Sequence, residues 1–246
     1  MSHFASGMIS AVSNLSDGPA PTFVSASANG YGTSASMPSG WSVGDLLMIF
    51  ATGYKLDTSC TGHNTPAGWT ELGNWTNKYS TLYMSRTKVF YRIAQSGDST
   101  VSLSVPGGET GYNSIMMAFR GVNTASPFEA METLNNQSAA ATIPYAQITT
   151  LGINRVAVQA ISSWNPGGVY STPYAGWTEL FDTQNAIGTA VDMRTFASAG
   201  LTSAGSQTRT GSYDWGRMAF AIKPAPAVVL VNRSIRMNPP IVRLAS

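Results

Sequence analysis

One stretch of this sequence occurs twice: Pro66-Ala67-Gly68-Trp69-Thr70-Glu71-Leu72, and then Pro173-Tyr174-Ala175-Gly176-Trp177-Thr178-Glu179-Leu180. A short apolar run precedes each copy, at residues 46–51 and 156–161. A Met-Ala-Phe triplet follows each copy, at residues 117–119 and 218–220. The three landmarks keep their order, which indicates an internal duplication.

The spacing between matched landmarks shortens along the chain. It falls from 110 residues (Leu46 to Val156) to 101 residues (Met117 to Met218). The elements persist while the loops between them shorten, so the duplicated unit is a structural scaffold. A duplicated scaffold explains most of the unusual residues structurally and leaves few for chemistry.

The composition favours a β protein. Of the 246 residues, 43% are hydrophobic and only 11% are charged, less than half the usual charged fraction of about 25%. The 24 glycines and 13 prolines suit short strands joined by tight turns. Antiparallel sandwiches of this length often form one domain, and we expect one here.

The local pattern agrees. Val101, Leu103 and Val105 alternate with serines, and such alternation with period two is typical of a half-buried strand. No segment sustains a helical period of useful length. We therefore predict an all-β fold: a two-sheet β-sandwich of jelly-roll type, built from two duplicated strand sets, with an extended C-terminal arm.

Three regions follow from these patterns. Residues 1–40 are small, polar and glycine-rich, which predicts a loosely structured lead-in with at most one edge strand. Residues 41–224 are expected to form the sandwich, with copies at about 44–122 and 154–224. Residues 225–246 form the C-terminal arm.

The charge is small but unevenly placed. The net charge of +2 is too small to imply nucleic acid as a partner. Four basic residues and no acid lie within residues 223–246, which leaves 10 basic against 12 acidic residues in the rest of the chain.

Other bulk features set further expectations. The one cysteine, Cys60, excludes an intrachain disulfide framework. The N-terminus lacks the pattern of a secretory signal, and no stretch reaches the roughly 20 apolar residues of a membrane span. We expect a protein made in the cytoplasm, unless a signal has been removed, with no membrane partner.

The arm combines apolar and basic residues and is interrupted by Pro239-Pro240. An extended apolar arm gains main-chain hydrogen bonds and buried side chains when it lies along a neighbour's sheet edge. The alternative is that it folds back on its own sandwich. The residues expected to mediate assembly are Val229, Val231, Arg233, Ile235, Arg236, Ile241 and Arg243.

The sequence contains few candidate catalytic residues. A Ser-His-Asp arrangement needs a positioned histidine, and the only histidines are His3 and His63. His63 lies near Cys60, but a structural zinc needs four ligands and the second half is missing. Glu71 and Glu179 occupy matched positions, where they are expected to meet basic partners or cap turns. We expect no metal, no cofactor and no enzyme activity.

Aromatic residues divide into two groups. Trp69 and Trp177 recur in matched frames, which favours core packing. Unmatched aromatics could stack on a glycan, and the first choices are Trp164, Tyr170 and Trp75. The alternative is that these rings pack beneath loops.

Four short motifs carry a resemblance to known proteins: Gly44-Asp45-Leu46-Leu47, Pro66-Ala67-Gly68-Trp69, Val89-Phe90-Tyr91-Arg92-Ile93-Ala94 and Phe119-Arg120-Gly121-Val122. In this order they resemble a β-sandwich module of tailed-bacteriophage structural proteins and some bacterial surface proteins, over residues 40–224. The resemblance implies a non-enzymatic component of the virion exterior.

The expected function is therefore a capsid decoration or cement protein, anchored through its C-terminal arm. Its expected partners are a major capsid or tail protein and further copies of itself. The alternatives are a tail or fibre accessory protein and a carbohydrate-binding adhesion module that recognises a host glycan. A secreted glycosidase is a third hypothesis, and it requires two acids in one cleft.

Overall fold

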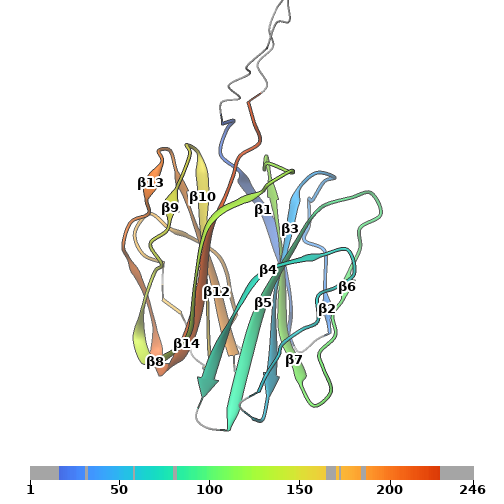
Figure 1. Cartoon of the computed structure of the whole chain (residues 1–246), viewed down its shortest axis with the longest axis vertical. Coiled ribbons are helices and arrows are strands. Elements are labelled where there is room, and N and C mark those ends of the chain that lie inside the picture. Colours follow the sequence, from blue (N-terminus) through green and yellow to red (C-terminus); the bar gives the residue numbers. More distant parts are fainter. Residues whose placement is uncertain are drawn as a thin grey trace, which may run out of the picture.

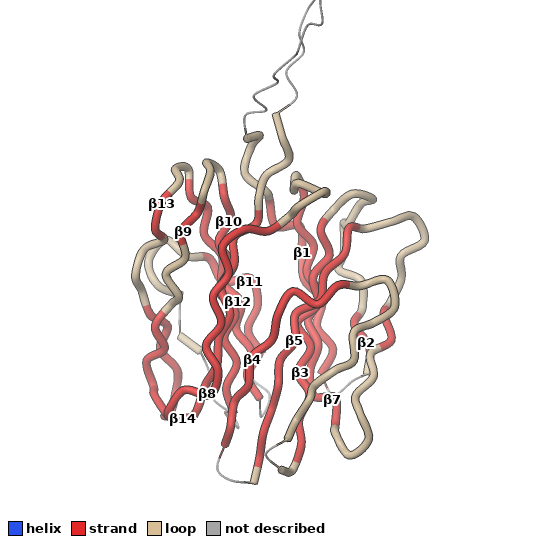
Figure 2. Tube along the Cα trace, viewed as in Figure 1, coloured by secondary structure: helices blue, strands red, loops and turns tan. Residues whose placement is uncertain are grey.

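The chain folds into strands and loops. A computed structural model describes residues 17–30, 33–57, 59–79, 82–164, 170–171, 173–183 and 187–227. These residues form fourteen strands and no helix (Figure 2), so the all-β prediction is confirmed. Within the same ranges there is accordingly no apolar helix of membrane-spanning length.

The strands fall into two sets of seven. The first set is β1 (Thr22–Gly30), β2 (Ser34–Ala35), β3 (Leu46–Lys55), β4 (Thr70–Tyr79), β5 (Tyr83–Ile93), β6 (Val101–Ser102) and β7 (Thr110–Arg120). The second set is β8 (Phe128–Pro144), β9 (Thr149–Thr150), β10 (Arg155–Trp164), β11 (Thr178–Thr183), β12 (Ile187–Phe196), β13 (Gly200–Leu201) and β14 (Ser206–Ile222).

Each set builds one complete five-stranded antiparallel sheet (Figure 1). The first sheet has the order β1-β7-β3-β5-β4, and the second has β8-β14-β10-β12-β11, which is the same order when β1 is matched with β8. Each set also pairs its two shortest strands, β2 with β6 and β9 with β13. The sandwich of two duplicated strand sets is confirmed. The connectivity gives no support to the jelly-roll type, because the chain completes one sheet before it enters the second.

The central strands are buried on both faces, which explains their continuous apolar runs. Leu46, Met48 and Phe50 of β3 face the core shared by the two sheets, whereas Leu47 and Ile49 face an outer cluster covered by loops. Strand β10 does the same, with Val156, Val158 and Ala160 in the shared core and Ala157 and Ile161 in a second outer cluster. The expected half-buried strands are therefore covered on both sides at the centre of each sheet.

The register corrects one sequence match. Met48 lies opposite Met117, and its counterpart Val158 lies opposite Phe220. The structural equivalent of Met117 is thus Phe220, two residues beyond Met218. A shift of two residues keeps the same side chains facing the core, so the Met-Ala-Phe triplet still marks the matched strands.

Both ends of the described chain lie at one end of the sandwich, which we call the terminal end (Figure 1). Asp17 pairs with Pro226, and the amide of Gly18 donates to the carbonyl of Ala225 at 2.9 Å. The opposite end is the distal end. The sequence leaves room for one edge strand within residues 1–40, and β1 is such a strand, because it pairs along its length with β7 at the edge of the first sheet.

Candidate functional site

The duplicated motif is a structural turn. The amide of Trp69 donates to the carbonyl of Pro66 at 3.1 Å, and that of Trp177 donates to Tyr174 at 2.9 Å. The glycines before these tryptophans, Gly68 and Gly176, have φ of +77° and +86°. A type II turn requires such a φ at its third position, and glycine adopts it without strain.

The two tryptophans are buried, as predicted, but in separate places. Trp69 is 8% exposed in the outer cluster of the first sheet, and Trp177 is 7% exposed in that of the second. The guanidinium of Arg92 lies 5.8 Å from the centre of the Trp69 ring. The repeated motif therefore fastens covering loops to the outer face of each sheet.

The matched glutamates do not face each other. Glu71 lies 3.4 Å from the ammonium of Lys88 and accepts a hydrogen bond from Asn74 at 2.8 Å, as expected of a paired surface acid. Glu179 is exposed on β11, in the other sheet. These acids do not form the pair across a cleft that a glycosidase uses.

Cys60 and His63 lie in one buried loop beneath a carboxylate. Glu109 accepts hydrogen bonds from the Thr61 amide at 2.7 Å, the Gly62 amide at 2.9 Å and the Cys60 thiol at 3.4 Å. Burial, reinforced by the charge of Glu109, raises the pKa of Cys60 to about 12. A thiol of this kind is not a nucleophile near neutral pH.

His63 has a structural environment too. It is fully buried, its Nε2 lies 3.2 Å from the carbonyl of Thr52, and burial lowers its pKa. Within the described ranges no three His, Cys, Asp or Glu side chains are grouped so as to hold a metal ion.

Two of the three predicted glycan contacts are wrong. Trp75 is fully buried between the sheets, where its Nε1 donates to Ser162 Oγ at 2.6 Å. Tyr170 is 4% exposed, and its hydroxyl lies 2.7 Å from Ser163 Oγ. Both rings belong to the interior because polar partners satisfy their donors there.

Trp164 lies at the distal end, at the last position of β10. Its ring lies 5.2 Å from Tyr54 of β3 and 5.6 Å from Tyr83 of β5, measured between ring centres. All three rings are half-buried, and they come from both sheets. Sequence reasoning missed Tyr54 and Tyr83 because they lie at strand ends that meet only in the folded molecule.

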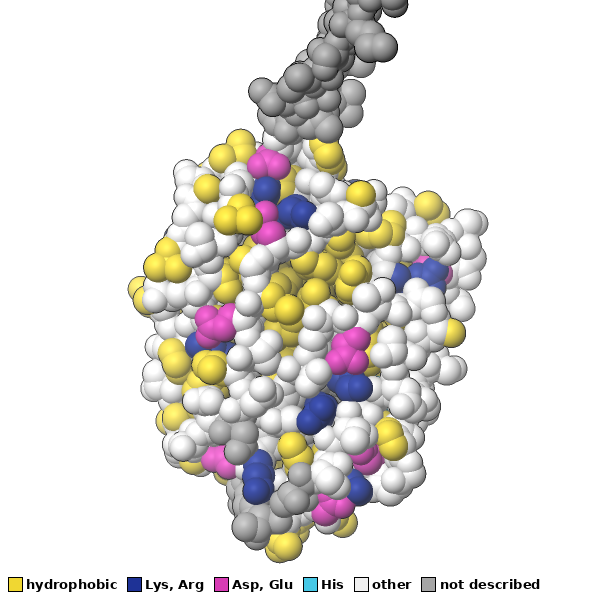
Figure 3. All heavy atoms as spheres, in the orientation of Figure 1, with side chains coloured by type: hydrophobic (Ala, Val, Ile, Leu, Met, Phe, Trp, Pro, Cys, Tyr) yellow, Lys and Arg dark blue, Asp and Glu magenta, His cyan; other side chains and the backbone are white. Residues whose placement is uncertain are grey.

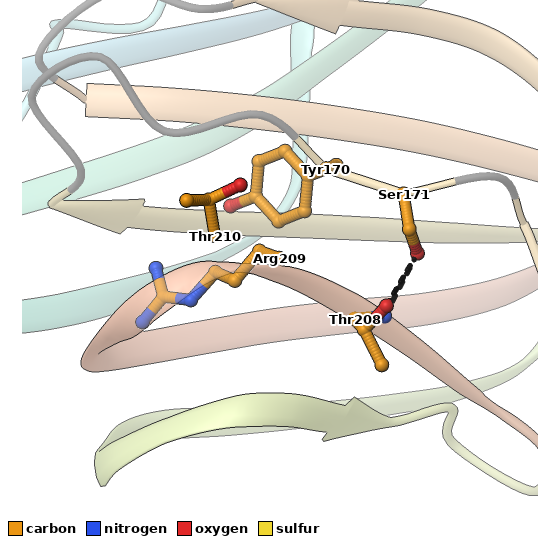
Figure 4. Close-up of a pocket in the computed structure, with 5 residues that line it drawn as sticks. All are labelled: Tyr170, Ser171, Thr208, Arg209 and Thr210. Carbon is orange, nitrogen blue, oxygen red and sulfur yellow. Dashed lines mark hydrogen bonds between the residues drawn. The ribbon is translucent and has the colours of Figure 1, made fainter.

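A shallow pocket of about 290 Å³ lies beside Tyr170 on the second sheet (Figure 4). Tyr170 and Ser171 form one wall, and Thr208, Arg209 and Thr210 of β14 form the other. Figure 4 shows the hydroxyl of Ser171 pointing to that of Thr208, at 2.7 Å. Arg209 is 5% exposed and donates from Nε to the carbonyl of Ala140 at 3.2 Å, which ties β14 to β8, and from Nη2 to the carbonyl of Tyr213.

The second copy also buries carboxylates that the first copy lacks. Asp192 is 1% exposed, accepts a hydrogen bond from the Tyr145 hydroxyl, and leaves Oδ1 without a partner. Burial raises the pKa of Asp192 to about 7 and that of Asp182 to about 6. The matched position in the first sheet is Phe90, since Glu71 pairs with Phe90 as Glu179 pairs with Asp192. Asp192 lies beneath the covering loops, where a polymeric substrate cannot reach it.

The motifs that carry the resemblance meet at the terminal end. Asp45 accepts hydrogen bonds from Arg120 Nε at 2.9 Å and from Nη2 at 2.8 Å. Arg120 Nη2 also donates to the carbonyl of Gly40 at 2.9 Å. Two motifs that are 75 residues apart therefore form one clamp, which closes the end of the first sheet.

The assembly residues predicted in the arm lie outside the described residues. They are Val229, Val231, Arg233, Ile235, Arg236, Ile241 and Arg243.

The described part of the chain defines a class: an internally duplicated, two-sheet antiparallel β-sandwich. No family model matches the chain, and neither a curated protein nor a solved structure matches it.

Proposed function

We propose that this chain is a non-enzymatic structural protein of the virion exterior of a tailed bacteriophage. In this proposal it decorates or cements the capsid and attaches through its C-terminal arm, residues 225–246. The observation that carries the proposal is the pairing of residues 17–18 with 225–226. It holds the first residues of the arm at the terminal end, so an arm attached to a particle would leave the distal end facing outward.

The low fraction of charged residues supports this role. A chain with only 11% charged residues suits a protein that packs against neighbours, and repeated weak contacts around a symmetric particle supply avidity that one contact lacks. The arm concentrates Arg233, Arg236 and Arg243 in a segment without acids, which would complement an acidic shell.

The test is deletion of residues 228–246. We expect the shortened protein to fold as the full chain does, with a similar thermal unfolding transition. We expect it to be absent from purified particles. A variant with Arg233, Arg236 and Arg243 replaced by Gln is the matched control for charge. If that variant is also lost and high salt releases the full chain, the arginines carry the attachment. If the shortened protein joins particles normally, the arm is not the anchor.

A second candidate rests on the distal rings of Tyr54, Tyr83 and Trp164. Aromatic rings from both sheets at an end directed away from the arm would suit glycan recognition by a tail accessory or adhesion protein. Trp164→Ala is expected to abolish binding to a glycan array, and Trp41→Ala, a half-buried ring near the terminal end, is expected to retain it. Equal binding by both variants would exclude this site.

A further inference from the structure

An apolar strip runs between the two sheets on the face shown in Figure 3, below the terminal end. Its residues come from both sheets: Leu72 of β4, Tyr91 and Ile93 of β5, and Phe128 and Met131 of β8. The rings of Tyr91 and Phe128 meet edge to face at 4.7 Å. Leu72, Tyr91, Ile93 and Phe128 are half-buried, and Met131 is 55% exposed. We call this set the front strip.

The duplication places an equivalent strip between β1 and β11, and the two strips are filled by different side chains. Phe23 matches Phe128, because Phe23 lies opposite Phe119 as Phe128 lies opposite Ile222. By the same registers, Leu180 matches Leu72 and Phe181 matches Gly73. The copy between β1 and β11 is thus filled by the large side chain of Phe181, where the front strip has a glycine.

Two methionines occupy the space that this glycine leaves. A Cβ at Gly73 would lie 2.9 Å from Cε of the buried Met218 and 3.6 Å from Sδ of Met131. The residue that matches Met131 in the other strip is Ala26. The strip between β1 and β11 therefore combines Phe181 with the small Ala26, whereas the front strip combines Gly73 with the flexible side chain of Met131. Methionine adapts its shape and is common at binding surfaces.

The backbone beside Met131 is strained. Ala130 has φ of +47°, in the left-handed region that is unfavourable for a residue with a side chain. It lies where the register between β8 and β14 shifts, between the pairs Phe220–Met131 and Ala221–Glu129. Such bulges re-aim neighbouring side chains, and this one accompanies a methionine that remains more than half exposed.

The chain itself supplies a segment that fits. The amide of Lys223 donates to the carbonyl of Pro127 at 2.8 Å, so the arm begins next to the upper limit of the front strip. Its first residues, Val228-Val229-Leu230-Val231, are apolar and favour extended structure. Nineteen residues, 228–246, can span about 60 Å when extended, which is enough to reach a neighbouring molecule.

We propose that the front strip receives residues 228–231 from a second copy of this chain. A second copy is favoured over the same chain because residues 225–226 are held at the terminal end by their pairing with residues 17–18, whereas the strip lies below that end (Figure 3). Arm exchange of this kind would link copies around a particle, and the inference rests on the arm being the attachment segment of the proposed function.

Disulfide trapping in the full-length chain tests the inference. Met131→Cys is combined with Leu230→Cys, and oxidation is followed by electrophoresis without reductant. The native Cys60 does not interfere, since it is 1% exposed and its pKa is raised to about 12. The matched control combines Leu230→Cys with Leu56→Cys, which replaces a 69% exposed residue after β3. Covalent dimers and larger species are expected from the first pair, and about tenfold fewer from the control.

The outcomes separate the alternatives. A disulfide within one chain would show that the arm folds back, and equal yields from both pairs would show that the strip is no receptor. Either result overturns arm exchange. Loss of particle attachment on deleting residues 228–246 together with failure to trap dimers would retain the proposed anchor and reject only its receptor. Trapped dimers of a protein that never joins particles would retain arm exchange and reject the proposed attachment to a particle.

Discussion

Leu72 and Leu180 hold the same position in two sheets: each is the extra residue of a β-bulge that follows the repeated Trp-Thr-Glu. The register of β4 with β5 shifts between Glu71 and Gly73, and that of β11 with β12 shifts between Glu179 and Phe181. Both leucines pack against the shared core. A bulge lets the edge strand turn its side chain inward after the turn, so the duplication preserves a backbone irregularity as well as a sequence.

Gly68→Ala and Gly176→Ala should each destabilise the protein by about 1–2 kcal/mol, because both replace a glycine at positive φ in a type II turn. Urea unfolding measures the change in the free energy of unfolding. Gly107→Ala is the control, since Gly107 has no positive φ and nothing lies within 4 Å of an added Cβ. Similar values for all three variants would contradict the turn assignment.

Ser162→Ala should cost about 2–3 kcal/mol, because it leaves the buried Nε1 donor of Trp75 without its partner and removes one of the two hydrogen bonds of Asn77 Nδ2. Ser162 Oγ accepts hydrogen bonds from Trp75 Nε1 at 2.6 Å and from Asn77 Nδ2 at 2.7 Å. These bonds join the two sheets below their apolar core. Ser102→Ala, at an exposed position of β6, should change stability by less than about 0.5 kcal/mol. A neutral Ser162 variant would show that the sheets do not depend on this polar contact.

Stability should fall as the pH rises from about 4 to about 7. The pKa of Asp192 is about 7 in the folded protein and about 3.9 when unfolded, so in this range the folded state holds a proton that the unfolded state has released. The free energy of unfolding then drops by up to about 1.4 kcal/mol for each pH unit.

Asp192→Asn should remove much of this slope, and the difference between the two proteins isolates Asp192 from other titrating groups. Unfolding by urea at several pH values gives both curves. Parallel curves for the two proteins would mean that Asp192 titrates normally in the folded state.

The thiol of Cys60 should not react with a thiol reagent at pH 8 in the folded protein. It should react when the protein is unfolded in urea. Burial and Glu109 together raise its pKa to about 12, so almost no thiolate is present. The kinetics of labelling measure this directly. Rapid labelling of the native protein would contradict the buried, hydrogen-bonded environment of the thiol.

The sequence predicts the central strands of both sheets well, because the repeated turn and the apolar runs are local signals. It does not predict that β1 and β8 begin the two copies, since Phe23 and Phe128 become equivalent only through their pairing partners. The burial of Trp75 and Tyr170 is not predicted, because no local pattern shows that a second sheet or a covering loop lies over them.

The polar residues of the second copy were missed for a related reason. An aspartate at the position of Asp192 alternates with apolar residues as a solvent-facing residue would, yet covering loops bury it. The assembly residues of the arm stay a prediction, since they lie outside the described residues.

We propose that this chain is an external virion component, and the first experiment is quantitative mass spectrometry of purified particles. The protein is scaled against the major capsid protein of the same particles. A protein that decorates the capsid should have a copy number comparable to that of the shell protein. A small multiple of three or six would move the protein to the tail, and absence from particles would contradict a role on the virion.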